Sequence, residues 1–338
     1  MVAAAVLHVN FRKSAKNFSL AYLSLRLEGA MAELTLRQLE LFSALPDYAT
    51  LSAAAERLHI SESALSQAIT SLEKAVGVQL CVRRKARGLQ LTPAGQHFAV
   101  RARGILRDSQ ELALELRGGA LRGPVRLGCF ASFATSVIPE ILDGFPRRYP
   151  EVSVEVTVGD DDDLLPALQS GRLDVAIVYD MLLPMGYAQR EIYATELEAI
   201  LHPAHPLAGR AAVDLADLAA EPLIMYDSSP STTTTHQAFA SRGLRPTVLT
   251  SVPQVILVQA LVGRGVGYGL LMSRPNSAPF SVEGRPLAVR PLRPSTGLTR
   301  VVAIWPEDMS LSPRAAALVE YAVEALGGCD APTAAGQQ

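Results

Sequence analysis

The sequence is poor in cysteine. Only Cys81, Cys129 and Cys329 occur among 338 residues, and they are far apart and odd in number. No CxxC or Cys/His spacing is present, so we predict neither a disulfide framework nor a zinc site. A reduced, cytoplasmic compartment is the simplest interpretation, with no metal and no cofactor.

Long apolar runs are also missing. None reaches the ~18 residues of a transmembrane helix, so no membrane partner is expected. The first thirty residues do not resemble a secretory signal, because Arg12, Lys13 and Lys16 interrupt their short apolar stretches. We treat residues 1–33 as an N-terminal extension and hypothesise that translation starts at Met31. The alternative is a genuine flexible arm, and N-terminal sequencing of the native protein would distinguish the two.

Motifs of enzymes are absent as well. No GxSxG, P-loop or HExxH occurs, and GRGVGYG lacks the strand-turn-helix setting of a nucleotide-binding loop. His202 and His205 lie beside prolines on a broken loop, which makes a poor metal pair. We therefore predict that the protein is not an enzyme. A solute-binding protein is a second alternative, disfavoured by the missing signal and by the N-terminal module described next.

Charge is divided unevenly along the chain. Residues 34–107 carry ten basic and five acidic side chains, whereas residues 108–338 carry seventeen basic and twenty-six acidic ones. A basic N-terminal module on an acidic body predicts an anionic partner for the first part only.

The N-terminal module has the pattern of a winged helix-turn-helix. A helix over 34–46 is followed by a second that Thr50 can cap, and by a third from Ser61 to about Val76 that Gly77 ends. The stretch VQLCVRRKARGLQLTP then reads as a β-hairpin wing with a basic turn. On the third helix, Leu65, Ala68, Ile69, Leu72 and Val76 form a core stripe.

The opposite face of this third helix is polar but uncharged. Ser63, Ser66, Gln67 and Thr70 share it, and such side chains suit the edges of bases in a major groove. Positive charge for phosphates would come from the wing. The alternative is a solvated face of a small helical domain.

A long helix should start at Thr92-Pro93 and run to about Arg117. It carries a heptad seam of Phe98, Ala102, Ile105, Ser109, Leu112 and Leu116, which predicts a dimerising linker. An ordinary helix packed on its own domain is the alternative. From Pro124 onward strands and helices alternate, and we expect an α/β body with mostly parallel sheets. The tail over 328–338 is predicted to be disordered.

The stretch LSAAAERLHISESALSQAITSLEKAVGVQL, with RRKARGLQLTPAG after it, resembles the N-terminal domain of LysR-type transcriptional regulators. The resemblance continues through SVIPEILDGFPRRYPEV, LQSGRLDVAIVYD and LVGRGVGYGLL. Cys81 stands where the family usually has Phe, and the smaller side chain would loosen wing packing without abolishing binding.

This resemblance implies an α/β chain in several parts. They are a winged helix-turn-helix over 34–92, a dimerising linker helix over 93–119 and a two-lobed, periplasmic-binding-protein-like effector domain over 123–327. Lobe 1 would comprise about 123–194 and 298–327, and lobe 2 about 195–297. Its partners would be inverted-repeat promoter DNA, a small-molecule inducer, further copies in a homodimer or homotetramer, and RNA polymerase.

The resemblance also implies site residues. The expected DNA contacts are Thr50, Ser52, Ser61, Glu62, Ser63, Ser66, Gln67, Arg83, Arg84 and Arg87. The effector cleft would lie at the carboxyl ends of strands. Its candidate residues are Ser132, Asp160, Tyr179, Asp180, Tyr226, Asp227, Ser228, Gly267 and Tyr268. Because these candidates are neutral or acidic, we hypothesise that the inducer is not a simple dianion and carries an amine or hydroxyls.

Overall fold

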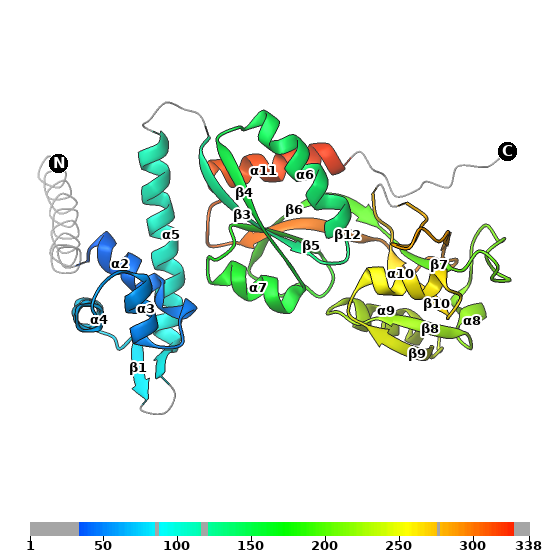
Figure 1. The fold of residues 1–338 in the computed structure, drawn as a ribbon, viewed down its shortest axis with the longest axis horizontal. Helices are drawn as coiled ribbons and strands as arrows, with labels where there is room; N and C mark the ends of the chain where they lie inside the picture. Colours follow the sequence, from blue (N-terminus) through cyan, green and yellow to red (C-terminus); the bar gives the residue numbers. More distant parts are fainter. Residues whose placement is uncertain (1–33, 85–87, 116–120, 276–277, 328–338) are drawn as a thin grey trace, which may run out of the picture. The chain divides into compact units, whose positions relative to one another are not determined.

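The computed structural model describes residues 34–84, 88–115, 121–275 and 278–327 (Figure 1). The predicted N-terminal extension, the C-terminal tail and Arg87 of the wing lie outside the described residues. The chain divides into two compact units, with the division close to Leu112.

Three helices of the first unit are held by polar caps at their first turns. Helix α2 (Leu36–Ser43) has a capping box between Thr35 and Gln38, α3 (Leu51–Arg57) is capped by Thr50, and α4 (Glu62–Val76) is capped by Ser61. A 3-10 turn η1 (Leu45–Asp47) follows α2. Gly77 ends α4 with a φ of 70°, as its sequence position predicts. The caps satisfy backbone N–H groups that a helix leaves open.

The wing is an antiparallel pair, β1 (Cys81–Arg84) and β2 (Gly88–Leu91). One carboxylate oxygen of Glu73, near the end of α4, accepts hydrogen bonds from the backbone N–H groups of Leu80 and Cys81 at 2.8 and 2.9 Å. Both of these residues are buried, and Cys81 belongs to the core of this unit. Glu73 therefore fixes the start of the wing to α4.

Helix α5 (Pro93–Glu115) packs on this unit with its first half. Ala102 is buried, and the rings of Phe98 and Phe42 meet edge to face with centroids 5.3 Å apart. Further along the predicted seam, Ile105 is 49% and Leu112 60% exposed, whereas Leu116 lies outside the described residues. The first part of the seam therefore packs within its own domain, whereas the apolar side chains of its second part are exposed.

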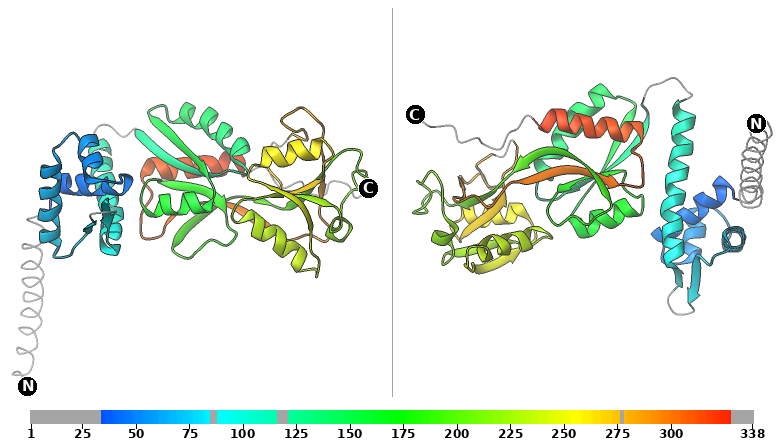
Figure 2. Two further views of the ribbon diagram at one scale, coloured as in Figure 1. Left: turned by 60° about the horizontal axis from the view of Figure 1, so that its bottom comes forward. Right: turned by 180° about the vertical axis from the view of Figure 1, so that it is seen from behind.

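The second unit contains two five-stranded sheets. Lobe 1 has the strand order β4-β3-β5-β12-β6. Its strands are β3 (Gly123–Phe130), β4 (Val152–Gly159), β5 (Val175–Tyr179), β6 (Tyr187–Thr195) and β12 (Thr299–Pro306). Helices α6 (Ala134–Arg148) and α11 (Pro313–Leu326) lie together on one face, and α7 (Asp161–Gln169) covers the other (Figures 1 and 2).

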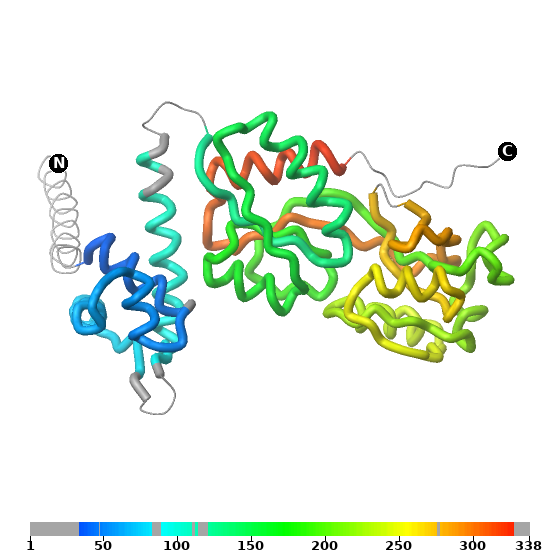
Figure 3. Tube along the Cα trace, in the orientation of Figure 1, coloured from blue at the N-terminus to red at the C-terminus, as the bar shows by residue number. Residues whose placement is uncertain are grey.

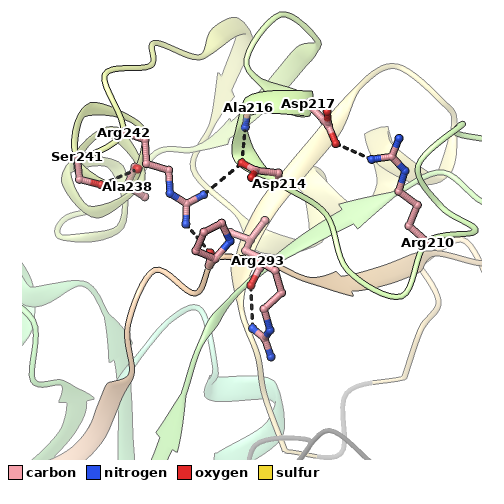
Figure 4. A network of polar contacts seen from close by, with 10 residues as sticks. Arg210, Asp214, Ala216, Asp217, Ala238, Ser241, Arg242 and Arg293 are labelled. Carbon is pink, nitrogen blue, oxygen red and sulfur yellow. Dashed lines mark hydrogen bonds and ion pairs between the residues drawn. The ribbon is translucent and has the colours of Figure 1, made fainter. Parts of the chain in front are cut away.

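Lobe 2 has the order β11-β7-β10-β8-β9. Its strands are β7 (Leu197–Leu201), β8 (Pro222–Tyr226), β9 (Thr247–Val252), β10 (Tyr268–Met272) and β11 (Ala288–Pro291). The core side chains of α8 (Leu215–Leu218) and α9 (Ser231–Ala240) pack on one face, and those of α10 (Val255–Gly263) on the other. Arg242 at the end of α9 donates to the Pro294 carbonyl and pairs with Asp214, the N-cap of α8 (Figure 4).

The prediction of mostly parallel sheets is wrong. In the lobe 1 sheet the pairs made by β3 are parallel, but β12 pairs antiparallel with β5 and β6. In the lobe 2 sheet the pairs made by β8 are parallel, but β7 pairs antiparallel with β10 and β11. The antiparallel pairs come from the strands at the crossings between the lobes: β12, on its return from lobe 2, lies between β5 and β6, and β7, on entering lobe 2, lies between β11 and β10. The trace leaves lobe 1 after β6 and returns at β12 (Figure 3).

Removing the Glu73 carboxylate tests the link between α4 and the wing. Glu73→Ala leaves two buried N–H groups without their acceptor, and we expect the free energy of unfolding of the first unit to fall by about 1–3 kcal/mol. Urea denaturation of the full chain measures the change. Lys74→Ala, at the exposed next position, is the control and should have little effect. Equal losses in both variants would contradict a role for the carboxylate.

Candidate functional site

The polar face of α4 is largely exposed, but most of its groups already have internal partners. The Ser61 oxygen accepts from the Ala64 N–H, and its hydroxyl lies 3.0 Å from that of Ser63. Thr70 donates to the Ser66 carbonyl one turn back. Gln67 is exposed and presents both a donor and an acceptor.

The two predicted contact groups Ser52 and Glu62 meet each other. The Ser52 hydroxyl on α3 donates to the Glu62 carboxylate on α4, which joins the two helices of the helix-turn-helix. Thr50 is exposed, and its oxygen caps α3. Arg83 and Arg84 lie on β1, paired with Leu89 and Gly88, and their side chains are outside the described residues.

A cavity of about 20 Å³ lies between the two lobes, and we call it the cleft cavity. This volume holds roughly one water molecule. Ser132 and Met181 of lobe 1 line it, together with residues of lobe 2. The lobe 2 residues are Leu197, Tyr226, Ser231, Thr234, Thr235, Val255, Leu270, Leu271, Met272 and Arg274. Its lining is therefore apolar, with hydroxyl groups at the first turns of α9 and one cation.

Two of the predicted effector residues line the cleft cavity. Ser132, which is buried, shares a hydrogen bond of 2.9 Å with the Tyr179 hydroxyl. Tyr226 ends strand β8, and burial raises the pKa of its phenol. Asp160 is close enough for its charge to raise that pKa further, and its carboxylate caps α7 through the N–H groups of Asp162 and Asp163.

Other predicted residues hold the structure rather than line this cavity. Tyr179 is fully buried against Phe130 and Phe133. Asp180 accepts from the Arg300 N–H and so joins β5 to β12. Asp227 is exposed and accepts from Thr232, and the Ser228 N–H donates to the same Thr232 hydroxyl.

Gly267 and Tyr268 lie away from the cleft cavity. They stand at the beginning of β10, whereas the cavity is lined by the end of that strand and by Arg274 beyond it. Four residues of strand at roughly 3.3 Å each separate the two ends. Both residues line a different cavity.

Sequence reasoning missed Arg274. Its guanidinium donates to the Ser132 carbonyl at 3.1 Å and so reaches from lobe 2 to lobe 1. Burial lowers its pKa, while the nearby Tyr179, Tyr193 and Glu198 raise it. Its position just past the carboxyl end of a strand was the available signal. The cleft therefore contains a cation that the neutral or acidic candidate set lacked.

Several alternative chemistries find no support in the described part of the chain. Cys81 and Cys129 are both buried, and burial raises the pKa of the Cys129 thiol far above its ordinary value. Among the described residues, no group of three or more His, Cys, Asp or Glu side chains could hold a metal ion. A search of the same residues finds no helix with the length and apolarity to cross a membrane.

The helix-turn-helix and the two-lobed α/β unit each match a family model. Residues 36–96 match the bacterial regulatory helix-turn-helix protein, lysR family, and residues 118–327 match the LysR substrate binding domain. The chain therefore belongs to the LysR family.

Individual relatives agree with this assignment. The chain is 34% identical over 195 residues to a probable hydrogen peroxide-inducible genes activator of Mycobacterium leprae, covering 57% of this chain and 62% of that one. It is 30% identical to the regulator MetR of Salmonella typhimurium, over 75% and 78% of the two chains. The crystal structure of HinK, a LysR family regulator from Pseudomonas aeruginosa, is 32% identical over 87% and 99%, with a TM-score of 0.57.

Asp161 should make the stability of the second unit depend on pH. This carboxyl group is buried at the start of α7, and burial, with Asp160 and Asp162, raises its pKa from 3.8 to about 7. The pKa of Asp161 is higher in the folded state than in the unfolded state, so ionising this carboxyl group destabilises the fold. The stability that the protonated carboxyl group contributes is therefore fully present below pH 3.8 and is lost as the pH rises through 7.

Asp161→Asn should therefore stabilise the protein more at pH 8 than at pH 5, as measured by urea denaturation at both values. Glu307→Gln, at an exposed position of the same unit whose charge is not among those that raise the pKa of Asp161, is the control. A gain for Asp161→Asn that is the same at both pH values would contradict the shifted pKa.

Proposed function

We propose that this protein is a ligand-responsive transcriptional regulator that binds inverted-repeat promoter DNA and senses a small-molecule inducer in its cleft. The observation that carries the DNA part is the exposed, nearly uncharged face of α4 on a basic module. Inducer binding would change how the two lobes close, and so the spacing of the DNA-reading units.

Base reading on α4 falls chiefly to Gln67. Ser61, Glu62 and Thr70 already have partners within the module, whereas the Gln67 amide can pair with adenine through N6 and N7. Ser63 and Ser66 would make further contacts in the same groove. Thr50, Ser52 and the wing residues Arg83, Arg84 and Arg87 would meet phosphates or the minor groove.

For the inducer we propose one anionic group on a mainly apolar body. The cleft cavity of about 20 Å³ is too small for such a ligand, so the lobes would open to admit it. Arg274 would then bind the anion, and the methionine and leucine side chains of the cleft cavity would pack against the rest. Glu198 acts on the Arg274 charge and offsets part of it, so a second anionic group would find no partner. Hydroxyls on Ser231, Thr234 and Thr235 would fix the orientation of the ligand.

We further propose that copies of the chain associate through α5, whose exposed Ile105 and Leu112 are apolar. Association into dimers or tetramers would place two reading helices on an inverted repeat. A cytoplasmic location and a contact with RNA polymerase belong to the same proposal. The name of the Mycobacterium leprae relative refers to a response to hydrogen peroxide. Cys129 of this chain is buried and gives no support to such a response here.

A salt titration on a promoter fragment tests DNA binding. If six or more phosphates are contacted, affinity should fall roughly 10³-fold between 50 and 200 mM salt. Arg83→Ala should weaken binding to all sequences and reduce this salt slope. Binding that is insensitive to salt on every DNA fragment would refute the proposal.

Gln67→Ala tests base reading separately. Loss of the amide should reduce the preference for the specific site by about 1–3 kcal/mol and leave non-specific affinity almost unchanged. Fluorescence anisotropy with matched and scrambled operators measures both. Gln96→Ala replaces an exposed glutamine on α5 and should leave the preference intact. A preference that survives Gln67→Ala would place base reading elsewhere.

Arg274→Met tests the inducer site by removing the charge while keeping much of the length. We expect affinity for a monocarboxylate inducer to fall about tenfold or more. Calorimetry comparing butyrate with succinate probes the charge directly, and succinate should not bind more tightly. Arg290→Met on β11 is the control, because Arg290 donates to its own strand's Val289 carbonyl. Tight binding of the dicarboxylate would contradict the single-anion proposal.

A further inference from the structure

Two polar contacts join the lobes at the cleft cavity, and we call them the lobe contacts. The Thr234 hydroxyl of lobe 2 donates to the Met181 Sδ atom of lobe 1 at 3.3 Å. The Arg274 guanidinium of lobe 2 donates to the Ser132 carbonyl of lobe 1 at 3.1 Å. All four residues line the same cavity, so the lobe contacts connect its opposite walls.

The Arg274 contact occupies the cation that the proposed inducer needs. A guanidinium has five N–H donors, and a carboxylate can accept two of them at once. Among the residues that the structure describes, Arg274 forms no ion pair, and its only hydrogen bond goes to the Ser132 carbonyl. A neutral carbonyl therefore stands where a carboxylate would bind more strongly. Burial lowers the pKa of Arg274, as expected for a cation withdrawn from water.

The closed cleft leaves no room for the proposed inducer. A cavity of about 20 Å³ holds roughly one water molecule, and even a small carboxylic acid is several times larger. A ligand can therefore reach Arg274 only after the cavity walls have moved apart. Because each lobe contact joins one wall to the other, this movement breaks both of them.

The two lobe contacts differ in what they leave behind when they break. The Thr234 hydroxyl also lies 3.2 Å from the Pro230 carbonyl of its own helix, so it keeps an acceptor in the open cleft. Met181 loses only a donor to a thioether, which is a weak acceptor. Arg274, in contrast, loses its one partner and gains another only when an anion arrives.

We propose that the cleft is autoinhibited: in the free protein the Ser132 carbonyl occupies Arg274, the Thr234–Met181 contact keeps the lobes closed, and the inducer binds by displacing both contacts. This inference rests on the proposed function, because it takes Arg274 as the residue that binds the anion of the inducer. Inducer binding then selects an open arrangement that is rare in the free protein, and this rarity lowers the apparent affinity.

Met181→Leu removes the sulfur acceptor and keeps an apolar side chain in the cleft. Butyrate should associate with the full chain about 2- to 10-fold faster, the factor expected for one lost hydrogen bond, and should bind correspondingly more tightly. NMR line-shape analysis of the Met272 methyl signal, from the lobe 2 wall of the cavity, measures the rate during a butyrate titration.

Met185→Leu is the matched control for this experiment. Met185 follows Met181 closely in the chain but is 99% exposed, so its replacement should leave the association rate unchanged. An association rate for Met181→Leu that equals or falls below that of the unaltered protein would overturn the proposal.

Thr234→Val tests the same contact without a ligand. In methyl-labelled methionine NMR of the free protein, the Met181 and Met272 signals should both move, because one comes from each lobe and the lobes part. The signal of Met225, which is buried in the core of lobe 2, should stay in place. Movement of the Met181 signal alone would mean that the contact does not hold the lobes, and would refute autoinhibition.

Ser241→Ala is the control for Thr234→Val. It also removes a hydroxyl that donates to a carbonyl of α9, that of Ala238, but Ser241 does not line the cleft cavity. None of the methionine signals of the cleft should move in this variant. Equal movement in both variants would assign the effect to α9 itself and would contradict a contact between the lobes.

The two experiments separate this inference from the proposed function. If butyrate does not bind to the unaltered protein, the single-anion inducer is wrong, and the NMR result on the free protein decides whether the lobes are held closed. If butyrate binds but neither Met181→Leu nor Thr234→Val loosens the lobes, the inducer proposal stands and autoinhibition is refuted.

Discussion

The second unit depends on the hydrogen bonds that hold the chain where it crosses between the two lobes. Thr195, at the end of β6 and 1% exposed, donates to the Ser273 carbonyl at 2.7 Å, and the Ser273 N–H donates to the Glu196 carbonyl. Arg274 follows directly, so this junction sets the place from which its guanidinium reaches Ser132. Both lobes therefore contribute to the cleft cavity, and Arg274 is the one cation among its described lining residues.

The position of the cleft cavity follows from strand direction. The carboxyl ends of β8 and β10 meet the first turns of α9 and the junction with lobe 1, so side chains of both lobes line the same cavity. Gly267 and Tyr268, at the beginning of β10, are excluded from it by the length of the strand.

Local signals in the sequence were enough for the helix-turn-helix. Its caps at Thr50, Ser61 and Gly77 act within one turn of chain, and the structure places them as predicted. Strand β6 has only a weak signal in the sequence, because it is an edge strand whose Gln189, Arg190 and Glu191 are exposed. Arg274 follows the carboxyl end of a strand, which was a signal for a cleft residue, but its contact with a residue 142 positions away could not be predicted from any local pattern. Gly267 and Tyr268 were assigned to the cleft although they begin their strand.

The uncharged face of α4 also has a structural reason that the sequence alone did not show. The one charge on it, Glu62, is held by the Ser52 hydroxyl of α3, and Glu73 at the far end of the helix is held by the backbone of the wing. Both carboxylates thus fasten α4 to its neighbours. The same interactions fix the rotation of α4, so that Gln67 projects from a rigid support. A side chain that must distinguish base pairs by two hydrogen bonds gains selectivity from that rigidity, because an amide free to reorient would accept several bases equally well.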